Sequence, residues 1–338
     1  MCQGENQFTA LEKKFYHYRG LMIRGLRNDI GTKHRSTSNF VIAGVLTVLF
    51  VDTMQGVSYR MWRYHFGAIS KIINLRGGIH ELAKSGGGES MVFTYFLFAV
   101  MGDTTSPVSD LFMTPEHYEE HKAILDQYSS DVPLFKMFPK ELLAHTLKVN
   151  LIRSQWAQSD LTTPSEFTQD ALMTLEFILE FSPATWARMK NGLYKGDLFL
   201  LGTIHQAAVT LYCICSLQSL FILPHTHFLT RLRIEMTASL FESLYKALKF
   251  QKFRKLLFWP LIVLGMAAVD RDENVRAFVL EQLGEVSRSI GLYAPVVAKN
   301  VIQRFWASGK IFWDDCFDEP YIFVHYGGQG LDLKNMTA

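Results

Sequence analysis

Histidine is the side chain that most often acts as a general base near neutral pH. His65 lies on the same side of a helical pattern as Trp62 and Phe66, and His205 interrupts a long apolar stretch. Neither histidine stands in a Ser-x-Gly elbow or beside a cysteine nucleophile motif. We therefore interpret both as hydrogen-bonded core histidines in preference to catalytic bases, and we predict no catalytic residue.

Metal binding is the second kind of chemistry that histidine pairs suggest. His225 and His227 are two positions apart after a proline, and no third ligand lies nearby. Structural zinc sites need four ligands, usually with CxxC-type spacing. The four cysteines lack such spacing: Cys2, Cys213, Cys215 and Cys316. We predict no metal site, and we interpret the thiols as small buried hydrophobic residues in a reducing compartment.

No cofactor is expected, because the chain contains no HExxH, Walker or Rossmann sequence. Asp314 and Asp315 are adjacent, so on a helix their carboxylates would diverge instead of forming an acid–base pair. We interpret both as solvated or capping residues.

The strongest basic cluster is residues 246–255, where Phe250 and Phe253 alternate with five cations. Such a stretch can contact phosphate groups or a membrane surface. A solvated helix end with its apolar residues turned inward is the interpretation that we favour. The candidate nucleic-acid-binding residues in this cluster are Lys249, Lys252, Arg254 and Lys255.

The composition describes a compact chain with a large apolar interior. Of 338 residues, 49% are hydrophobic and 20% are charged, and the formal net charge of +2 is too small to predict nucleic-acid binding over the whole surface. We expect one domain over residues 1–326 and a frayed tail at 327–338. Residues 198–223 are long enough to span a membrane, but polar side chains interrupt them, so we expect a buried central helix and no transmembrane segment.

Apolar residues recur with helical spacing along the whole chain, and no alternation of strands and helices is visible. The fold class is therefore all-α, with packed antiparallel helix pairs and no sheet. The helix at 62–78 should bury Trp62 and end at Gly77 and Gly78. Residues 85–90 are expected to form a flexible loop. The proline-punctuated segment 104–139 is expected to be mostly irregular, with short helical pieces such as residues 115–128, and to form a binding surface or a lid. The other expected helices cover 9–29, 40–54, 91–103, 140–157, 165–181, 197–221, 229–250, 256–269, 272–290 and 294–307.

Two separated blocks of the sequence resemble the fungal-specific transcription factor domain, the regulatory region of zinc binuclear cluster regulators. The first block comprises Trp62, His65, Gly67 and Ala68, and it closes with Arg76, Gly77 and Gly78, the Gly-Ala pair standing one residue nearer the histidine than in the family pattern. The second block comprises Phe258, Trp259, Pro260, Leu261, Gly265, Ala267, Arg276 and Trp306, and between the blocks lie Ala208 and Tyr212. Trp313 and Asp314 resemble a tryptophan position beyond the second block.

The resemblance implies an all-α regulatory domain in a nuclear, often dimeric, transcription regulator. It implies a small apolar effector, a protein partner or a homodimer, and the candidate ligand-binding residues are Trp62, His65, His205 and Trp259. In the family a six-cysteine zinc cluster usually precedes this domain, whereas here the resemblance begins close to Met1. We therefore do not expect direct DNA binding by this chain. From the sequence we expect either a fragment or a mispredicted gene, or a regulator that works through a partner, or a domain with another role.

Two other functions remain open from the sequence. One is an enzyme or small-molecule-binding protein of secondary metabolism that reuses the same fold, with residues 104–139 as pocket and lid. The other is a peripheral membrane or scaffold protein that uses the basic helix at residues 246–255.

Overall fold

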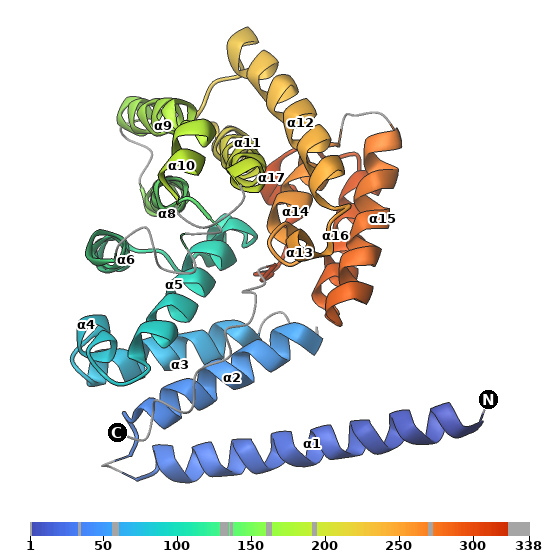
Figure 1. Ribbon diagram of the computed structural model, residues 1–338. Helices are drawn as coiled ribbons and strands as arrows, with labels where there is room; N and C mark the ends of the chain where they lie inside the picture. Colours follow the sequence, from blue (N-terminus) through green and yellow to red (C-terminus); the bar gives the residue numbers. More distant parts are fainter. Residues whose placement is uncertain are drawn as a thin grey trace. The chain divides into compact units, whose positions relative to one another are not determined.

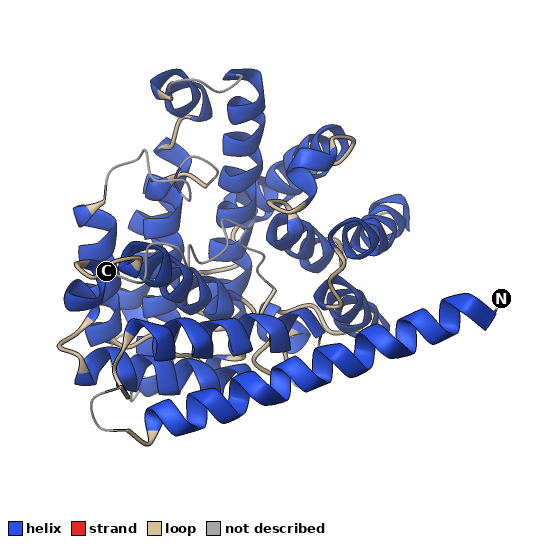
Figure 2. Ribbon diagram, turned by 60° about the horizontal axis from the view of Figure 1, so that its bottom comes forward, coloured by secondary structure: helices blue, strands red, loops and turns tan. Residues whose placement is uncertain are grey.

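The computed structural model describes residues 2–32, 35–55, 61–128, 135, 138–159, 164–190, 195–269 and 273–323, with only the backbone described for 2–12, 54, 55 and 164. Within these ranges every regular element is a helix, and Figure 2 shows helices and loops without a strand. The all-α prediction is confirmed.

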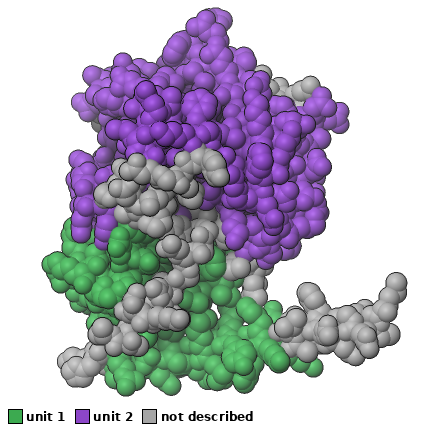
Figure 3. Space-filling view, viewed as in Figure 1, with its two compact units in different colours: residues 1–95, 328–338 green, residues 96–327 purple. Residues whose placement is uncertain are grey.

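The chain divides into two compact units (Figure 3), and unit 1 comprises residues 1–95 and 328–338. In its described part, α2 packs against both α1 and α3. The core-facing side chains of α3 are Trp62, Phe66, Ile69 and Ile73, spaced at helical intervals as the sequence predicts. The helices of unit 1 are α1 (Cys2–Ile30), α2 (Asn39–Gln55), α3 (Met61–Leu75), α4 (Ile79–Ala83) and the beginning of α5 (Gly88–Thr104).

Helix α3 ends as its glycine pair predicts. Gly77 and Gly78 have φ angles of 104° and 94°, a region that a side chain with a Cβ atom rarely enters. The amide of Gly78 donates to the carbonyl of Ile73 over 2.9 Å, which closes the helix end. The glycines therefore turn the chain sharply from α3 into α4.

The expected flexible loop at residues 85–90 is wrong in its second half, because Gly88 begins helix α5. The Gly88 amide donates to the Ser85 carbonyl over 2.8 Å. A Cβ atom at position 88 would overlap the carbonyl oxygen of Leu82. Glycine therefore allows close backbone packing at this tight α4–α5 connection.

Unit 2 comprises residues 96–327 and is built around α11, which packs against α8, α9, α10, α12, α14 and α17 (Figure 1). The helices of unit 2, besides the end of α5, are η1 (Val108–Asp110), α6 (Pro115–Gln127), α8 (Lys140–Gln158), α9 (Pro164–Glu180), α10 (Pro183–Met189), α11 (Lys195–Ser219), α12 (His227–Ala247), α13 (Gln251–Arg254), α14 (Phe258–Ala267), α15 (Glu273–Ile290), α16 (Ala294–Ala307) and α17 (Trp313–Cys316).

Helix α11 is long and apolar enough to cross a membrane, but its neighbours cover it. Of its most apolar 18-residue window, 78% is buried inside the structure. A helix that is apolar on all sides is stable in water only when other elements surround it. The predicted buried central helix is confirmed.

Two predicted segments differ in detail from the structure. Residues 246–255 do not form one helix, because α12 ends at Ala247 and α13 begins at Gln251. In the segment 104–139 the helical piece expected at 115–128 is confirmed as α6, and η1 was not expected, while residues 129–134, 136 and 137 lie outside the described residues. The single-domain boundary at 1–326 stays a prediction, and the expected frayed tail at 327–338 also lies outside the described residues.

Candidate functional site

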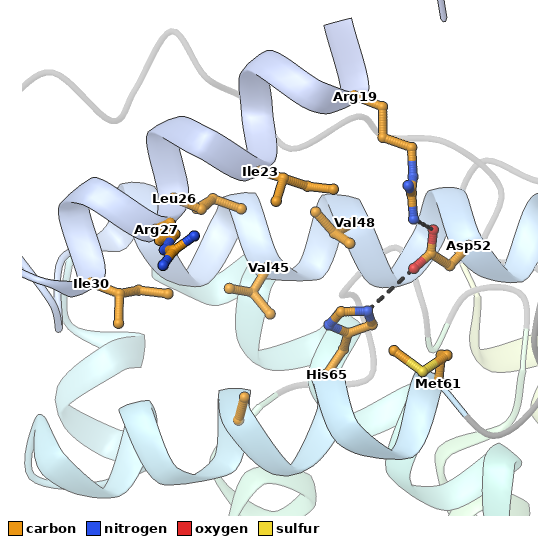
Figure 4. Close-up of a pocket in the computed structure, with 11 residues that line it drawn as sticks. Arg19, Ile23, Leu26, Arg27, Ile30, Val45, Val48, Asp52, Met61 and His65 are labelled. Atoms are coloured by element: carbon orange, nitrogen blue, oxygen red, sulfur yellow. Dashed lines mark hydrogen bonds and ion pairs between the residues drawn. The ribbon is translucent and has the colours of Figure 1, made fainter. Parts of the chain in front are cut away.

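A pocket of about 480 Å³ lies within unit 1, between helices α1, α2 and α3 (Figure 4). Its volume falls in the range of roughly 300–1,000 Å³ that is typical of small-molecule sites. The lining residues are Arg19, Ile23, Leu26, Arg27 and Ile30 from α1, Val45, Val48 and Asp52 from α2, and Met61, His65 and Ala68 from α3. Each of the three helices therefore contributes one wall.

The carboxylate of Asp52 organises the polar end of the pocket. Its Oδ1 accepts a hydrogen bond from Nη2 of Arg19 over 2.8 Å, and its Oδ2 lies 3.2 Å from Nε2 of His65. Figure 4 shows both side chains pointing toward Asp52 from the two flanking helices. A buried carboxylate is costly without partners. This cluster therefore links α1, α2 and α3 at one end of the pocket.

The middle of the pocket is apolar. Ile23 and Leu26 face it from α1, and Val45 and Val48 face it from α2 (Figure 4). An apolar ligand body in this position would gain roughly 25 cal/mol for each Å² of apolar surface removed from water. The pocket thus combines apolar walls with a small number of convergent polar groups, which is the usual composition of a ligand site.

Of the candidate ligand residues on α3, His65 lines this pocket and Trp62 does not. The indole of Trp62 is buried. The centroid of the Trp62 ring lies 5.9 Å from the centroid of the Phe66 ring and 4.2 Å from the guanidinium carbon of Arg63. Trp62 therefore belongs to the packed core behind the pocket, and His65 belongs to the pocket wall.

The other two candidates, His205 and Trp259, both lie beside Phe138 in the core of unit 2. The His205 ring stacks on Phe138 at 4.0 Å, and the Trp259 ring lies 6.3 Å from the same phenyl group. The indole Nε1–H of Trp259 donates to Oγ1 of Thr104 over 2.8 Å. Sequence reasoning did not anticipate that these two residues share a neighbour.

A fully buried arginine, which sequence reasoning missed, joins several elements of unit 2. The Arg153 guanidinium donates to the carbonyl oxygens of Asp103 and Ser106 over 2.9 and 3.1 Å. It also donates to the Tyr212 hydroxyl over 3.1 Å and to Oδ1 of Asp314 over 2.9 Å. Arginine suits this place because its planar group directs several donors at fixed angles. We call the side chains of Arg153, Tyr212, Asp314 and Asn150 the buried polar network.

Tyr212 and Asn150 extend the buried polar network toward α5. The Tyr212 hydroxyl donates to Oδ1 of Asn150 over 2.5 Å, and the Asn150 amide donates to the carbonyl of Val100 over 2.8 Å. Burial raises the pKa of Tyr212 to about 12, so the phenol keeps its proton and remains a donor. The signal in the sequence was the position of Asn150 and Arg153 on the buried side of α8.

The end of α5 is also fixed by two indoles. The Trp313 Nε1–H donates to the carbonyl of Thr104 over 2.9 Å, while Trp259 uses the hydroxyl of the same threonine. The interpretation of Asp314 as a solvated or capping residue is confirmed in part, since its carboxylate accepts from the first amide of η1, but it missed the pairing with Arg153. Oδ1 of Asp314 accepts from Arg153 and from the amide of Val108, because η1 and α17 meet there.

Of the candidate nucleic-acid residues, Lys249 lies between α12 and α13, Lys252 and Arg254 lie in α13, and Lys255 follows it. Lys252 forms an ion pair with Asp197, and Nζ of Lys249 lies 4.4 Å from the ring centroid of Tyr245. Arg254 lies 3.8 Å from Glu285, and Lys255 is exposed. Carboxylates within unit 2 therefore already engage part of this basic cluster.

The possible metal ligands do not converge in the described part of the chain. His225 and His227 are exposed, and no group of three or more His, Cys, Asp or Glu side chains among the described residues could hold a metal ion. Burial raises the pKa of the thiols of Cys213 and Cys316, which makes them poor nucleophiles.

Comparisons of the sequence with known proteins identify a family. The sequence pattern described as "Fungal specific transcription factor domain" matches residues 2–320. The "Phomenoic acid biosynthesis cluster-specific transcriptional regulator" of Leptosphaeria maculans is 36% identical over 317 residues. This alignment covers 94% of the chain, and the chain spans 60% of the relative's length. No solved structure matches the chain. The chain belongs to the fungal-specific transcription factor domain family.

Proposed function

We propose that this chain is the regulatory part of a nuclear protein that controls transcription of a biosynthetic gene cluster. The observation that carries the proposal is the 36% identity to a cluster-specific transcriptional regulator over nearly the whole chain. The chain's regulator-like character follows from its family, and the enzyme alternative is not favoured. The nuclear location and the control of a gene cluster are inferred from that relative.

We infer that the input to this domain is a small effector bound in the unit 1 pocket. The pocket supports this role because all three of its walls come from different helices, so a ligand would change the packing of α1 on α2 and α3. A protein partner or a second copy of the chain is the other input that the family membership leaves open.

The function can be tested by deleting the gene in its host and measuring transcripts of the neighbouring genes. We expect coordinated loss of transcripts from one biosynthetic cluster, restored by the wild-type gene. If the transcripts stay unchanged while the product pattern changes, the protein acts as an enzyme and the proposal is wrong.

The role of the pocket is tested by complementation with a variant that fills it. Ala68 is exposed in the pocket wall, so Ala68→Phe adds volume there without opening the core. The matched control is Lys71→Phe, an exposed position on α3 outside the pocket lining. We expect transcripts to become independent of culture conditions only in Ala68→Phe. Equal behaviour of the two variants would remove the pocket from the proposal.

A further inference from the structure

The charges around the unit 1 pocket are not balanced evenly. At one end, Asp52 neutralises Arg19 through a 2.8 Å contact and also holds His65. Arg27 also lines the pocket, and within the described part of the chain no carboxylate pairs with it. The nearest acid in sequence, Asp29, instead lies 3.4 Å from Arg35. The pocket therefore carries a net positive charge on the α1 side.

We propose that the unit 1 pocket binds an elongated apolar monocarboxylate, with the carboxylate on Arg27 and the apolar body directed toward Asp52. The proposal rests on the effector role argued above and assigns the chemical class of that effector. An arginine guanidinium recognises a carboxylate through two parallel hydrogen bonds, a geometry that lysine cannot reproduce.

The separation of the charged groups sets the shape of the ligand. Arg19 and Arg27 are eight residues apart on α1, which corresponds to about 12 Å along the helix axis. The pocket side chains between them, Ile23 and Leu26, are apolar, and Val45 and Val48 face them from α2 (Figure 4). A compact polar metabolite would leave this wall exposed to water, whereas a chain-like apolar body would cover it.

The opposite end of the pocket disfavours a second acid group. Asp52 is buried there and already receives Arg19 and His65, so a second ligand carboxylate would approach a carboxylate of the same sign. A monocarboxylate avoids this repulsion and keeps its single charge at Arg27. Repulsion between like charges also excludes a ligand with a cationic amine at Arg27, because the amine would approach a guanidinium of the same sign.

The proposal can be tested by calorimetric titration of the purified chain with decanoate below its critical micelle concentration. The comparison ligands are decanol, which lacks the charge, and decanedioate, which carries a second carboxylate. We expect decanoate to bind about tenfold or more tightly than decanol, as a charge-assisted hydrogen bond implies. Decanedioate should bind more weakly than decanoate.

Two variants assign the carboxylate to its partner. Arg27→Gln should remove the difference between decanoate and decanol, while decanol affinity stays the same. The matched control is Arg24→Gln, since Arg24 is an exposed cation of the same helix that does not line the pocket. Circular dichroism of each variant confirms that the helical content is intact.

The proposal is overturned if decanoate and decanol bind equally, or if Arg24→Gln and Arg27→Gln weaken decanoate by the same factor. Failure of decanoate to bind, in a protein whose transcripts still respond to Ala68→Phe, also overturns the ligand class. In that last case the regulatory function stands, and only the chemistry of the effector is wrong.

Discussion

Each of the two units contains an arginine–aspartate pair, and the pairs differ in what surrounds them. Arg19 and Asp52 in unit 1 are 2.8 Å apart, and their side chains are 29% and 7% exposed. Arg153 and Asp314 in unit 2 are 2.9 Å apart and are 0% and 18% exposed. The distances are nearly equal, so the distance alone does not reveal the role of either pair.

The partners of each arginine reveal the difference. Arg153 also donates to two backbone carbonyls and to Tyr212, so its two Nη groups join α8 to α5, α11 and α17. Arg19 instead lines a pocket with 29% of its side chain exposed, so its pair borders a space that the apolar body of a ligand could fill. We infer that the Arg153 pair is structural and that the Arg19 pair is part of a binding site.

The comparison requires that unit 1 has a packed core behind its pocket. We expect Trp62→Ala to destabilise the protein by about 3–5 kcal/mol, because Trp62 is buried and its removal leaves a large cavity. The measurement is the free energy of unfolding in urea. Tyr64→Ala on the same helix is the control, since Tyr64 is 72% exposed and should change stability by less than about 0.5 kcal/mol. A loss below about 1 kcal/mol for Trp62→Ala would mean that unit 1 is loosely packed.

The structural role of the Arg153 pair predicts the next largest effect. Arg153→Met should cost about 3 kcal/mol, because it leaves Asp314 and several buried acceptors without their donor. The partial exposure of Asp314 keeps this value at the lower end of the usual range. The test is a double-mutant cycle with Asp314→Asn. Additive losses would show that the two side chains are not coupled.

A pH titration tests how closed the interior of unit 2 is. Burial lowers the pKa of His121 to about 4, although its hydrogen bond to the His117 carbonyl opposes this shift. The unfolded chain therefore binds more protons between the unfolded pKa and pH 4, so stability falls as the pH falls through this window. From about pH 7 to about pH 5, we expect His121 to account for a loss of about 2 kcal/mol.

The readout for His121 is the difference between wild type and His121→Asn, since other groups also titrate in this range. Urea unfolding of both proteins at the two pH values gives this difference. The variant should be less stable near neutral pH but should lose less stability on acidification. Parallel pH profiles would mean that the interior around His121 admits water.

The sequence predicted the helices well because their apolar residues follow helical spacing over long stretches. The close of α3 was also predictable, since Gly77 and Gly78 have conformations that few other residues adopt. The helix expected at 229–250 was three residues too long, since α12 ends at Ala247, and the short helix α13 was not expected. Of the two phenylalanines expected to turn inward, Phe253 does so from α13, whereas Phe250 is 54% exposed.

The sites were harder to predict because their residues come from distant segments. Asp52 is the only charged residue of α2, which was a usable signal for a buried polar group. Its partner Arg19 lies 33 positions earlier, and Asp314 lies 161 positions after Arg153. Spacing within one helix cannot identify such pairs. The family resemblance did mark Tyr212, Trp259, Trp313 and Asp314. In the structure the two tryptophans donate to Thr104 at the end of α5. The other two bond Arg153, which donates to the Asp103 carbonyl one residue earlier.

The smallest effect is expected at the pocket pair, and it is the sharpest test of the comparison. Arg19→Gln should lower the free energy of unfolding by less than about 1 kcal/mol, because the Arg19 side chain is 29% exposed and the pair is partly solvated. His65 remains 3.2 Å from Asp52, so the carboxylate keeps a partner after the substitution. The measurement is the same urea titration used for Arg153→Met. A loss of about 3 kcal/mol or more at Arg19 would make the two pairs equivalent, and the pocket would then be a packing defect rather than a binding site.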